Sequence, residues 1–193
     1  MSEPAPRRMD VRVGSSTDAL TPLAGARRSL HARSQQWVGL LAIALAALAG
    51  DQLTKHIVSS HLTLDAERHV VGPLSIHHVQ NSGIAFGLFA SATPIVTVLT
   101  AIAVAWMVVF FARSGSRHPV LPIALGLLIG GSASNLLDRV RLGHVTDFID
   151  LRFWPAFNLA DSFIVLGVLV LLAALLLPQR ARTRPQPVSD AQG

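Results

Sequence analysis

Four long apolar segments constrain this chain more than any other feature of its sequence. They cover residues 37–58, 93–112, 119–137 and 157–177. A helix needs about 20 mostly apolar residues to cross a bilayer, and each segment is about that long. With 51% hydrophobic and only 14% charged residues, the chain is also too apolar for an ordinary soluble domain of 193 residues. We therefore predict an all-α membrane protein with four transmembrane helices.

The first segment allows a second interpretation. Its apolar part ends in Leu-Ala-Ala-Leu-Ala-Gly, which is similar to the end of a secretory signal peptide cleaved near Gly50. The helical pattern nevertheless continues through Asp51 and Lys55 without a breaker, which makes one segment of about 22 residues. We prefer the transmembrane interpretation for this reason.

The arginine residues indicate how the chain is oriented, because loops rich in Lys and Arg stay in the cytoplasm. Arginines cluster in the first 36 residues, at residues 113–118 and at residues 180–184. Arg139, Arg141 and Arg152 are exceptions that lie among acidic residues in the opposite, outer loop. Both termini are therefore expected in the cytoplasm.

Composition divides the chain into three parts. Residues 1–36 lack a sustained hydrophobic period, so we expect a disordered basic cytoplasmic tail there. Residues 37–178 form the four-helix transmembrane domain, and residues 179–193 form a second cytoplasmic tail. The net charge of +5 comes largely from the flanking arginines and does not predict a nucleic-acid partner.

A small extramembrane β-sheet is predicted between the first two spans. Residues 74–79 alternate apolar and polar side chains and follow a Gly72-Pro73 turn, which is a strand and hairpin signal. His77 and His78 are adjacent, so on a strand they point to opposite faces and are poorly placed to share a metal. The chain has no cysteine, which excludes disulfides and thiolate metal sites.

Asp147 and Asp161 are the first candidates for chemistry. They lie on either side of a Pro-containing turn, and Asp161 is followed by an almost unbroken apolar run, residues 163–178, where an ionised carboxylate is costly to desolvate. Two carboxylates held close cannot both ionise, so the pair supplies a general acid and a general base. The structural alternative is that Asn158 and Asp161 cap a helix, while Asp147 and Asp150 are solvated loop acids.

Asp51 and Lys55 lie four residues apart, with the acid first, so they share a helical face and can pair. We interpret this pair as a positioning element, with Lys55 also near enough to the helix end to snorkel. Gly126 and Gly130 have the spacing of a helix-packing motif. Following the chain through the predicted topology brings six polar residues to the outer interface: Asp51, Lys55, Asn81, Asp138, Asp147 and Asp161. A purely structural bundle has little reason to gather them on one side.

Five motifs carry a resemblance to a known family. They are Asp51-x-x-Thr54-Lys55, Asn81-x-Gly83-x-Ala85-Phe86, Gly130-Gly131-x-x-x-Asn135-x-x-Asp138-Arg139, Val145-x-Asp147-Phe148 and Phe157-Asn158-x-Ala160-Asp161. In this order they resemble the motifs of lipoprotein signal peptidase, also called signal peptidase II. The resemblance covers roughly residues 50–167, and the tails lie outside it.

The resemblance implies an intramembrane aspartic endopeptidase in the bacterial cytoplasmic (inner) membrane, a multi-pass protein with its active site near the outer face. Such an enzyme removes the signal peptide from prolipoproteins just before a diacylglyceryl-modified cysteine. It needs no metal or cofactor, contacts membrane lipid, is inhibited by globomycin and is expected to be monomeric.

The family's site residues transfer to this chain motif by motif. The catalytic aspartates correspond to Asp147 and Asp161. The supporting or substrate-binding residues correspond to Asp51, Lys55, Asn81, Gly83, Asn135, Asp138, Arg139, Asn158 and Ala160. Three features depart from the usual pattern, namely Ile84, the serines Ser132 and Ser134, and the short loop at residues 150–156.

The expected mechanism has one aspartate activate water while the other, protonated, donates to the scissile carbonyl. Three other functions remain to be weighed against it. An ion transporter would need acids near the midplane and an internal repeat, a structural membrane protein leaves the polar residues unexplained, and a Ser-Lys protease would use Ser59 or Ser60 with Lys55.

Overall fold

The computed structural model of the chain describes residues 21–83, 93–114 and 119–176. Within these residues, every helix contains a stretch long and apolar enough to cross a membrane. The prediction of four transmembrane helices is confirmed. The helices are α1 (Thr21–His61), α2 (Thr93–Arg113), α3 (Leu121–Leu142) and α4 (Leu159–Leu176).

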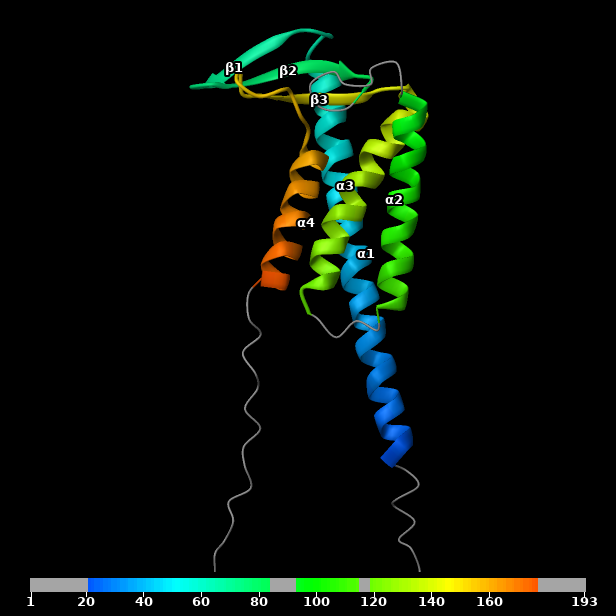
Figure 1. Cartoon of the computed structure of the whole chain (residues 1–193). Helices are drawn as coiled ribbons and strands as arrows, with labels where there is room; N and C mark the ends of the chain where they lie inside the picture. The colour runs from blue at the N-terminus through cyan, green and yellow to red at the C-terminus, as the bar shows by residue number, and fades with distance from the viewer. Residues whose placement is uncertain (1–20, 84–92, 115–118, 177–193) are drawn as a thin grey trace, which may run out of the picture.

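A three-stranded antiparallel sheet lies across one end of the helical bundle (Figure 1). Its strands, in spatial order, are β1 (Glu67–Val71), β2 (Leu74–Asn81) and β3 (Val145–Asp150). The predicted hairpin is confirmed, with Gly72 at the turn in the left-handed region at φ 55°. β3 is an addition to the prediction, and it places Asp147 opposite Val79 of β2.

α3 is the central helix of the bundle, and small residues let its neighbours approach closely. A Cβ added at Gly130 would meet the Ala44 backbone of α1 below 3.0 Å, and one at Gly131 would meet the Ala160 backbone of α4 equally closely. A larger side chain at either position would therefore push two helices apart. The packing role predicted for the small residues of this segment is confirmed.

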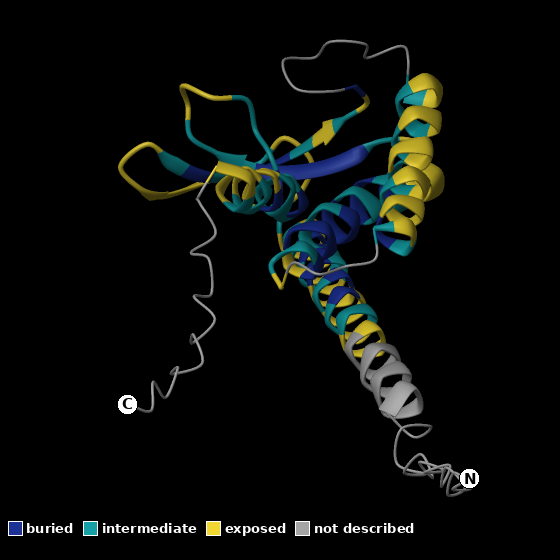
Figure 2. Ribbon diagram, turned by 60° about the horizontal axis from the view of Figure 1, so that its bottom comes forward, coloured by how far each residue is buried: buried dark blue, intermediate teal, exposed yellow. Residues whose placement is uncertain are grey.

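The bundle has an apolar half and a polar half. Leu40, Ala44, Phe111, Leu125 and Ile129 of α1, α2 and α3 form an apolar core, whereas the buried polar residues include Asp51, Asn135 and Asp138. Figure 2 shows that α3 and β3 carry the buried surface, whereas α2 is exposed along most of its length. Because α2 is almost wholly apolar, its exposed surface fits the lipid phase.

The first helix starts earlier than predicted. α1 begins at Thr21, so residues 21–36 are helical where a disordered tail was expected. Extending an existing helix needs no new nucleus, and the Ala, Leu, Arg and Gln residues of this stretch favour helix. The remainder of the predicted tail, residues 1–20, lies outside the described residues.

Two other boundaries also differ from the prediction. α3 continues to Leu142, so Asp138 and Arg139 belong to the helix and not to an outer loop. α4 begins at Leu159 because Phe157 still pairs with Ile149 of β3 and keeps the chain extended. The first shift brings two charged residues into α3, and the second leaves Phe157 and Asn158 ahead of α4.

Candidate active site

The start of α4 positions Asp161. The Asn158 side-chain oxygen accepts a hydrogen bond from the Asp161 N–H at 3.0 Å, and the Asn158 N–H donates to Asp161 Oδ2 at 3.3 Å. This reciprocal pair is a capping box. The helix-cap interpretation of Asn158 and Asp161 is thus confirmed, and it is compatible with chemistry because the cap holds the Asp161 carboxylate at the mouth of the helix.

Asp147 lies within β3 and is 2% exposed, so the interpretation of it as a solvated loop acid is wrong. Asn158 Nδ2 donates to Asp147 Oδ1 at 2.6 Å, and Asn81 Nδ2 donates to Oδ2 at 2.9 Å. Burial raises the pKa of Asp147 to about 6, against the opposing hydrogen bond from Asn81, and the nearby charge of Asp161 raises it further. This carboxyl can therefore exchange a proton near neutral pH.

The orientation of two of these amides follows from their other contacts. The Asn81 oxygen accepts from the Gly83 N–H at 3.0 Å, and the Asn158 oxygen accepts from the Asp161 N–H. A backbone N–H can only donate, so each amide must turn its NH₂ group toward Asp147. Both oxygens of Asp147 are thereby held by fixed donors.

The Asn135 side chain of α3 orients Asp161 as Asn81 and Asn158 orient Asp147. Its Nδ2 donates to Asp161 Oδ1 at 2.8 Å, while its Oδ1 accepts from Lys55 Nζ at 2.8 Å. Because an ammonium group has no acceptor, Lys55 determines which end of the Asn135 amide faces Asp161. Lys55 thus acts on the aspartate through Asn135 without touching it.

Lys55 itself is enclosed by three acceptors. Besides Asn135, it contacts Asp51 Oδ2 at 2.6 Å and Asp138 Oδ2 at 2.8 Å, and its side chain is only 5% exposed. The predicted pairing with Asp51 is confirmed. The expected snorkelling is wrong, since all three N–H groups of the ammonium are used inside the bundle.

Asp51 connects three helices and is fully buried. Its Oδ1 accepts from the Ala160 N–H of α4 at 2.8 Å, and its Oδ2 accepts from Ser134 Oγ of α3 at 2.7 Å. Gln52 Nε2 donates to Ser134 Oγ at 2.9 Å and to Asp138 Oδ1 at 2.7 Å. These contacts hold the first turn of α4, which carries Asp161, against α1 and α3.

Arg139 lies beside the aspartates with unused hydrogen-bonding capacity. Its Nη2 donates to the Gly83 carbonyl oxygen at 3.2 Å, and its Nη1 lies 3.4 Å from the Asn135 carbonyl oxygen. Its buried Nε finds no partner among the described residues. A guanidinium placed in this way can bind a carbonyl group of a substrate.

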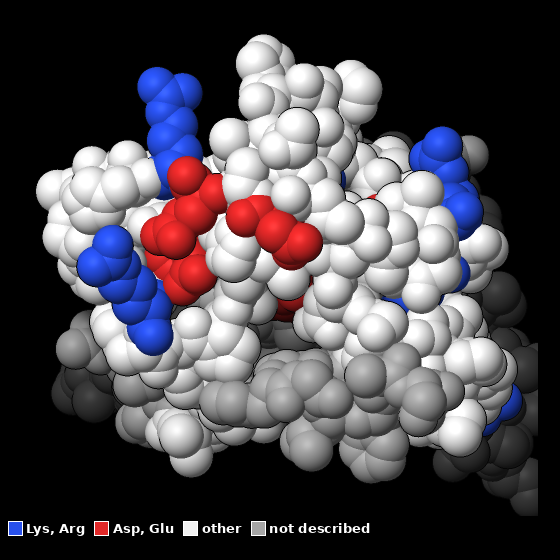
Figure 3. All heavy atoms as spheres, turned by 90° about the horizontal axis from the view of Figure 1, so that it is seen from above, with Lys and Arg blue, Asp and Glu red and all other residues white. Residues whose placement is uncertain are grey.

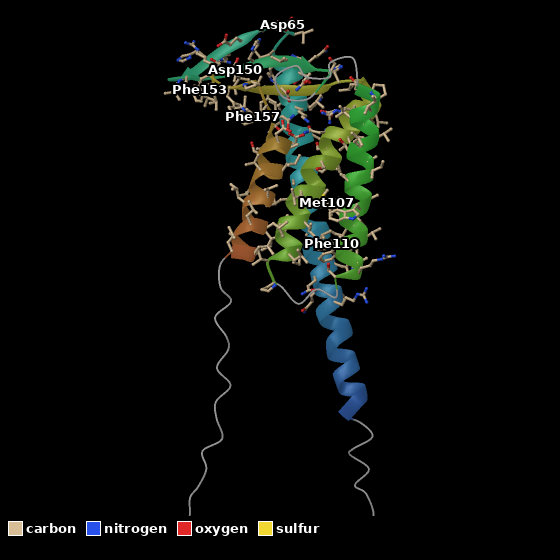
Figure 4. All side chains as sticks on the ribbon, in the orientation of Figure 1. Asp65, Met107, Phe110, Asp150, Phe153 and Phe157 are labelled. Atoms are coloured by element: carbon tan, nitrogen blue, oxygen red, sulfur yellow. The ribbon has the colours of Figure 1, made fainter. Side chains whose placement is uncertain are left out.

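The aspartates open onto two cavities. Polar side chains, including those of both aspartates, line a cavity of about 310 Å³. A largely apolar cavity of about 480 Å³ begins at Asp161 and follows α4 past Val165 to Leu169. Phe153 and Phe157 contribute to it, and Figure 4 shows both at the sheet end of α4. The cavity that holds the polar side chains of the site thus lies next to a more apolar groove.

Comparison with known proteins decides the family. A family model described as signal peptidase (SPase) II matches residues 43–177. The chain belongs to the signal peptidase II family. A lipoprotein signal peptidase of Moorella thermoacetica is 40% identical over 139 residues, which cover 72% of this chain and 93% of the relative. One of Symbiobacterium thermophilum is 36% identical over 149 residues, or 74% and 97% of the two chains.

Two solved structures described as bacterial membrane enzymes have the same fold as this signal peptidase II. One matches with a TM-score of 0.67 and 31% identity, covering 71% of this chain and 87% of the other. The second matches with a TM-score of 0.66 and 30% identity, covering 72% and 94%.

The structure brings the predicted site residues of this signal peptidase II into one connected group. Gly83 and Ala160 contribute backbone N–H groups, and the other nine residues contribute side chains. Ile84, Ala85 and Phe86 lie outside the described residues. Gln52 and Ser134 are further members that the motifs did not identify. Ser134 was noted only as a departure from the family pattern, and a polar Gln beside Asp51 in an apolar segment was the available signal for Gln52.

Proposed function

We propose that Asp147 and Asp161 are the catalytic pair with which this signal peptidase II removes the signal peptide from prolipoproteins. The supporting observation is that both carboxylates line one cavity and each accepts hydrogen bonds from fixed amide donors. Such an arrangement keeps the carboxylates oriented while leaving them accessible to water and substrate. No cation caps either of them directly among the ion pairs of the described residues.

The chemistry requires only these carboxylates and water. One aspartate, ionised, takes a proton from water as the water oxygen attacks the scissile carbonyl carbon. The other, protonated, donates its proton to the carbonyl oxygen, which gives a neutral tetrahedral intermediate. As the C–N bond breaks, the first aspartate returns its proton to the leaving amine and the second recovers its own.

The neighbouring residues divide into two roles. Asn135, Asn158 and Asn81 orient the aspartates, because their own oxygens are held by other donors. Arg139 supplies a cation at the cavity wall and binds the substrate backbone near the scissile bond. Lys55 and its two carboxylate partners, Asp51 and Asp138, hold the helices together and do not contact the substrate.

The apolar cavity beside Asp161 accounts for a lipidated substrate. We assign the scissile bond to the position just before a diacylglyceryl-modified cysteine, whose acyl chains would lie along α4 beside Val165 and Leu169. Each CH₂ group buried contributes about 0.8 kcal/mol, so the chains hold the peptide at the depth of the aspartates. Precursor without lipid should therefore be cleaved much more slowly.

The sheet end of the bundle is assigned to the outer face of the bacterial cytoplasmic membrane. The arginine clusters outside the bundle support this orientation, with both termini in the cytoplasm. A signal peptide enters the membrane from the inner side, and its cleavage site reaches the outer face. The two aspartates would contact the cleavage site there. We further propose that the protein acts as a monomer and that globomycin binds this polar cavity.

Cleavage by the purified full-length protein tests the proposal. The wild-type enzyme and the Asp147→Asn and Asp161→Asn variants are incubated in detergent with lipidated precursor, and the released peptide is measured by mass spectrometry. Cleavage before the modified cysteine by the wild type alone supports the assignment. Normal cleavage by a folded variant would remove the aspartic mechanism and favour the Ser-Lys alternative.

A further inference from the structure

A separate cavity lies at the sheet end of α1, outside the candidate active site. Its volume is about 390 Å³, and none of its lining residues lines either cavity beside the aspartates. α1 contributes Thr54, Ile57, Val58 and His61, while the sheet contributes Arg68, Ile76 and Phe148. The site is thus a junction between a membrane-spanning helix and the sheet.

Strand register places Arg68 on the helix-facing side of the sheet. Arg68 of β1 is directly opposite Ile76 of β2, so the two side chains share one face, and both line the cavity. Glu67 and His69, the neighbours of Arg68 on the strand, point to the other face. The guanidinium is therefore separated from the nearest carboxylate along its own strand.

The cavity has a basic polar rim and an apolar remainder. Arg68 and His61 line it, and no carboxylate does. The ion pairs found among the described residues do not include Arg68. Seen from the sheet end, the surface carries a group of acidic side chains with basic side chains beside it (Figure 3). The cavity instead presents basic side chains and no carboxylate to a ligand.

His61 adds a second polar group to the rim. Its Nδ1 lies 2.9 Å from the Ile57 carbonyl oxygen, which can only accept, so Nδ1 carries the hydrogen of that bond. The other ring nitrogen, Nε2, remains as the group that can contact a ligand.

Below the rim, α1 exposes apolar surface toward the lipid phase. Leu53 is 60% exposed and Ile57 is 48% exposed, and both belong to the membrane-spanning part of α1. A ligand that places an anion at Arg68 and an alkyl chain along these residues matches the whole site. We infer that this cavity binds an anionic glycerophospholipid, with its phosphate at Arg68 and one acyl chain along α1.

The test uses the full-length protein in detergent, with bound lipid counted by native mass spectrometry during titration. Phosphatidylglycerol, phosphatidylcholine and inorganic phosphate are the three probes. The wild type should bind phosphatidylglycerol several-fold more tightly than phosphatidylcholine, whose choline cation meets Arg68 unfavourably. Arg68→Gln should weaken phosphatidylglycerol binding about fivefold, because one basic side chain contributes about 1 kcal/mol to an anionic lipid.

Two further variants make the result specific. Arg141→Gln is the matched control, since Arg141 is an exposed arginine at the sheet end of α3 that does not line this cavity. It should leave binding unchanged. Ile57→Trp adds bulk at a half-exposed position and should weaken binding of both lipids by filling the acyl part of the site.

Three outcomes would overturn the inference. Equal binding of the two lipids by the wild type removes the charge selectivity. Equal loss in Arg68→Gln and Arg141→Gln reduces the effect to general surface charge. Inorganic phosphate that binds as tightly as phosphatidylglycerol, with no effect of Ile57→Trp, reveals an anion site without a lipid chain.

Discussion

Two pairs of carboxylates lie at the same end of this bundle, and their surroundings differ. Asp51 and Asp138 share one ammonium group, Lys55 Nζ, at 2.6 and 2.8 Å. Asp147 and Asp161 face a cavity and accept hydrogen bonds only from amide groups of side chains and backbone. The first pair shares one cation and is enclosed, whereas the second is oriented and lines a cavity.

The difference shows how one bundle separates structural from chemical acids. Asp51 and Asp138 are both held by the Lys55 ammonium, so they join helices and do not face the cavity beside the aspartates. Amide donors orient Asp147 without neutralising it, and burial then raises its pKa to about 6. The Asn135 amide joins the two pairs, since it contacts Lys55 on one side and Asp161 on the other.

The largest expected effect comes from the accessible pair. Asp147→Asn and Asp161→Asn should each lower kcat by roughly a thousandfold or more, because each aspartate supplies a proton transfer that the other cannot make at the same moment. The double variant should be hardly worse than either single one. Rates of lipidated precursor cleavage by the purified variants measure this, with Asp150→Asn as the control on the same strand. A double variant whose loss is the product of the two single losses would mean that the aspartates act independently.

Removing the shared cation should have the next largest effect, on stability. Lys55→Met leaves Asp51 and Asp138 buried without a counter-ion, which costs about 3–5 kcal/mol of unfolding free energy. The loss is measured by monitoring unfolding in detergent with circular dichroism. Adding Asp138→Asn to Lys55→Met removes one unpaired charge and should restore part of it. An unchanged unfolding midpoint in Lys55→Met would show that the ion pairs of Lys55 do not hold the helices together.

The raised pKa of Asp147 predicts how stability depends on pH. Its folded pKa of about 6 exceeds the ordinary 3.8, so the folded state holds the proton more tightly. Ionising this group therefore costs stability progressively as pH rises from about 4 to about 6, by up to about 3 kcal/mol. The stability of the wild type relative to Asp147→Asn should fall over this window and remain level above it.

Asp150 provides the control for that pH dependence. The Arg152 N–H holds the pKa of Asp150 below its ordinary value, so this group contributes stability that is lost only at lower pH. Asp150→Asn should therefore show no change between pH 4 and pH 6 relative to the wild type. A constant difference between Asp147→Asn and the wild type across this window would contradict burial as the cause of the raised pKa.

The smallest effect is expected at Ser134, which links the enclosed pair to α4. Ser134→Ala removes a hydrogen bond to buried Asp51 and leaves Gln52 with one acceptor fewer, which should cost about 1–2 kcal/mol of stability. Turnover by the folded variant should fall less than tenfold. Ser132→Ala is the matched control, because the described residues offer the Ser132 side chain no hydrogen bond. Equal stability of the two variants would show that the Ser134 contact contributes nothing.

Local patterns of the sequence predicted most of the fold. The four spans follow from their apolar length, and β2 follows from the alternation at residues 74–79. β3 lacks such alternation because Val145, Thr146, Asp147 and Phe148 are all buried. Its pairing with β2 is set by tertiary contacts, which a single strand's pattern does not reveal.

The site was predictable as a set of residues but not as a set of contacts. The motifs named the members, yet they did not show that Lys55 contacts Asn135 of α3 or that Asp51 caps α4 through the Ala160 N–H. These contacts depend on how three helices are rotated and how far each one extends. Gln52 and Ser134 were missed for the same reason, since their partners lie on other helices.

One matched comparison tests the separation of structural from chemical acids most directly. Asp161→Asn and Asp51→Asn each replace one carboxylate at the same end of the bundle with a group of the same size. Single-turnover cleavage of lipidated precursor is measured for each, and the rate is divided by the folded fraction found by circular dichroism. Asp51→Asn should retain a rate within tenfold of the wild type, while Asp161→Asn should lose roughly a thousandfold or more. Similar rates for the two folded variants would contradict the assignment.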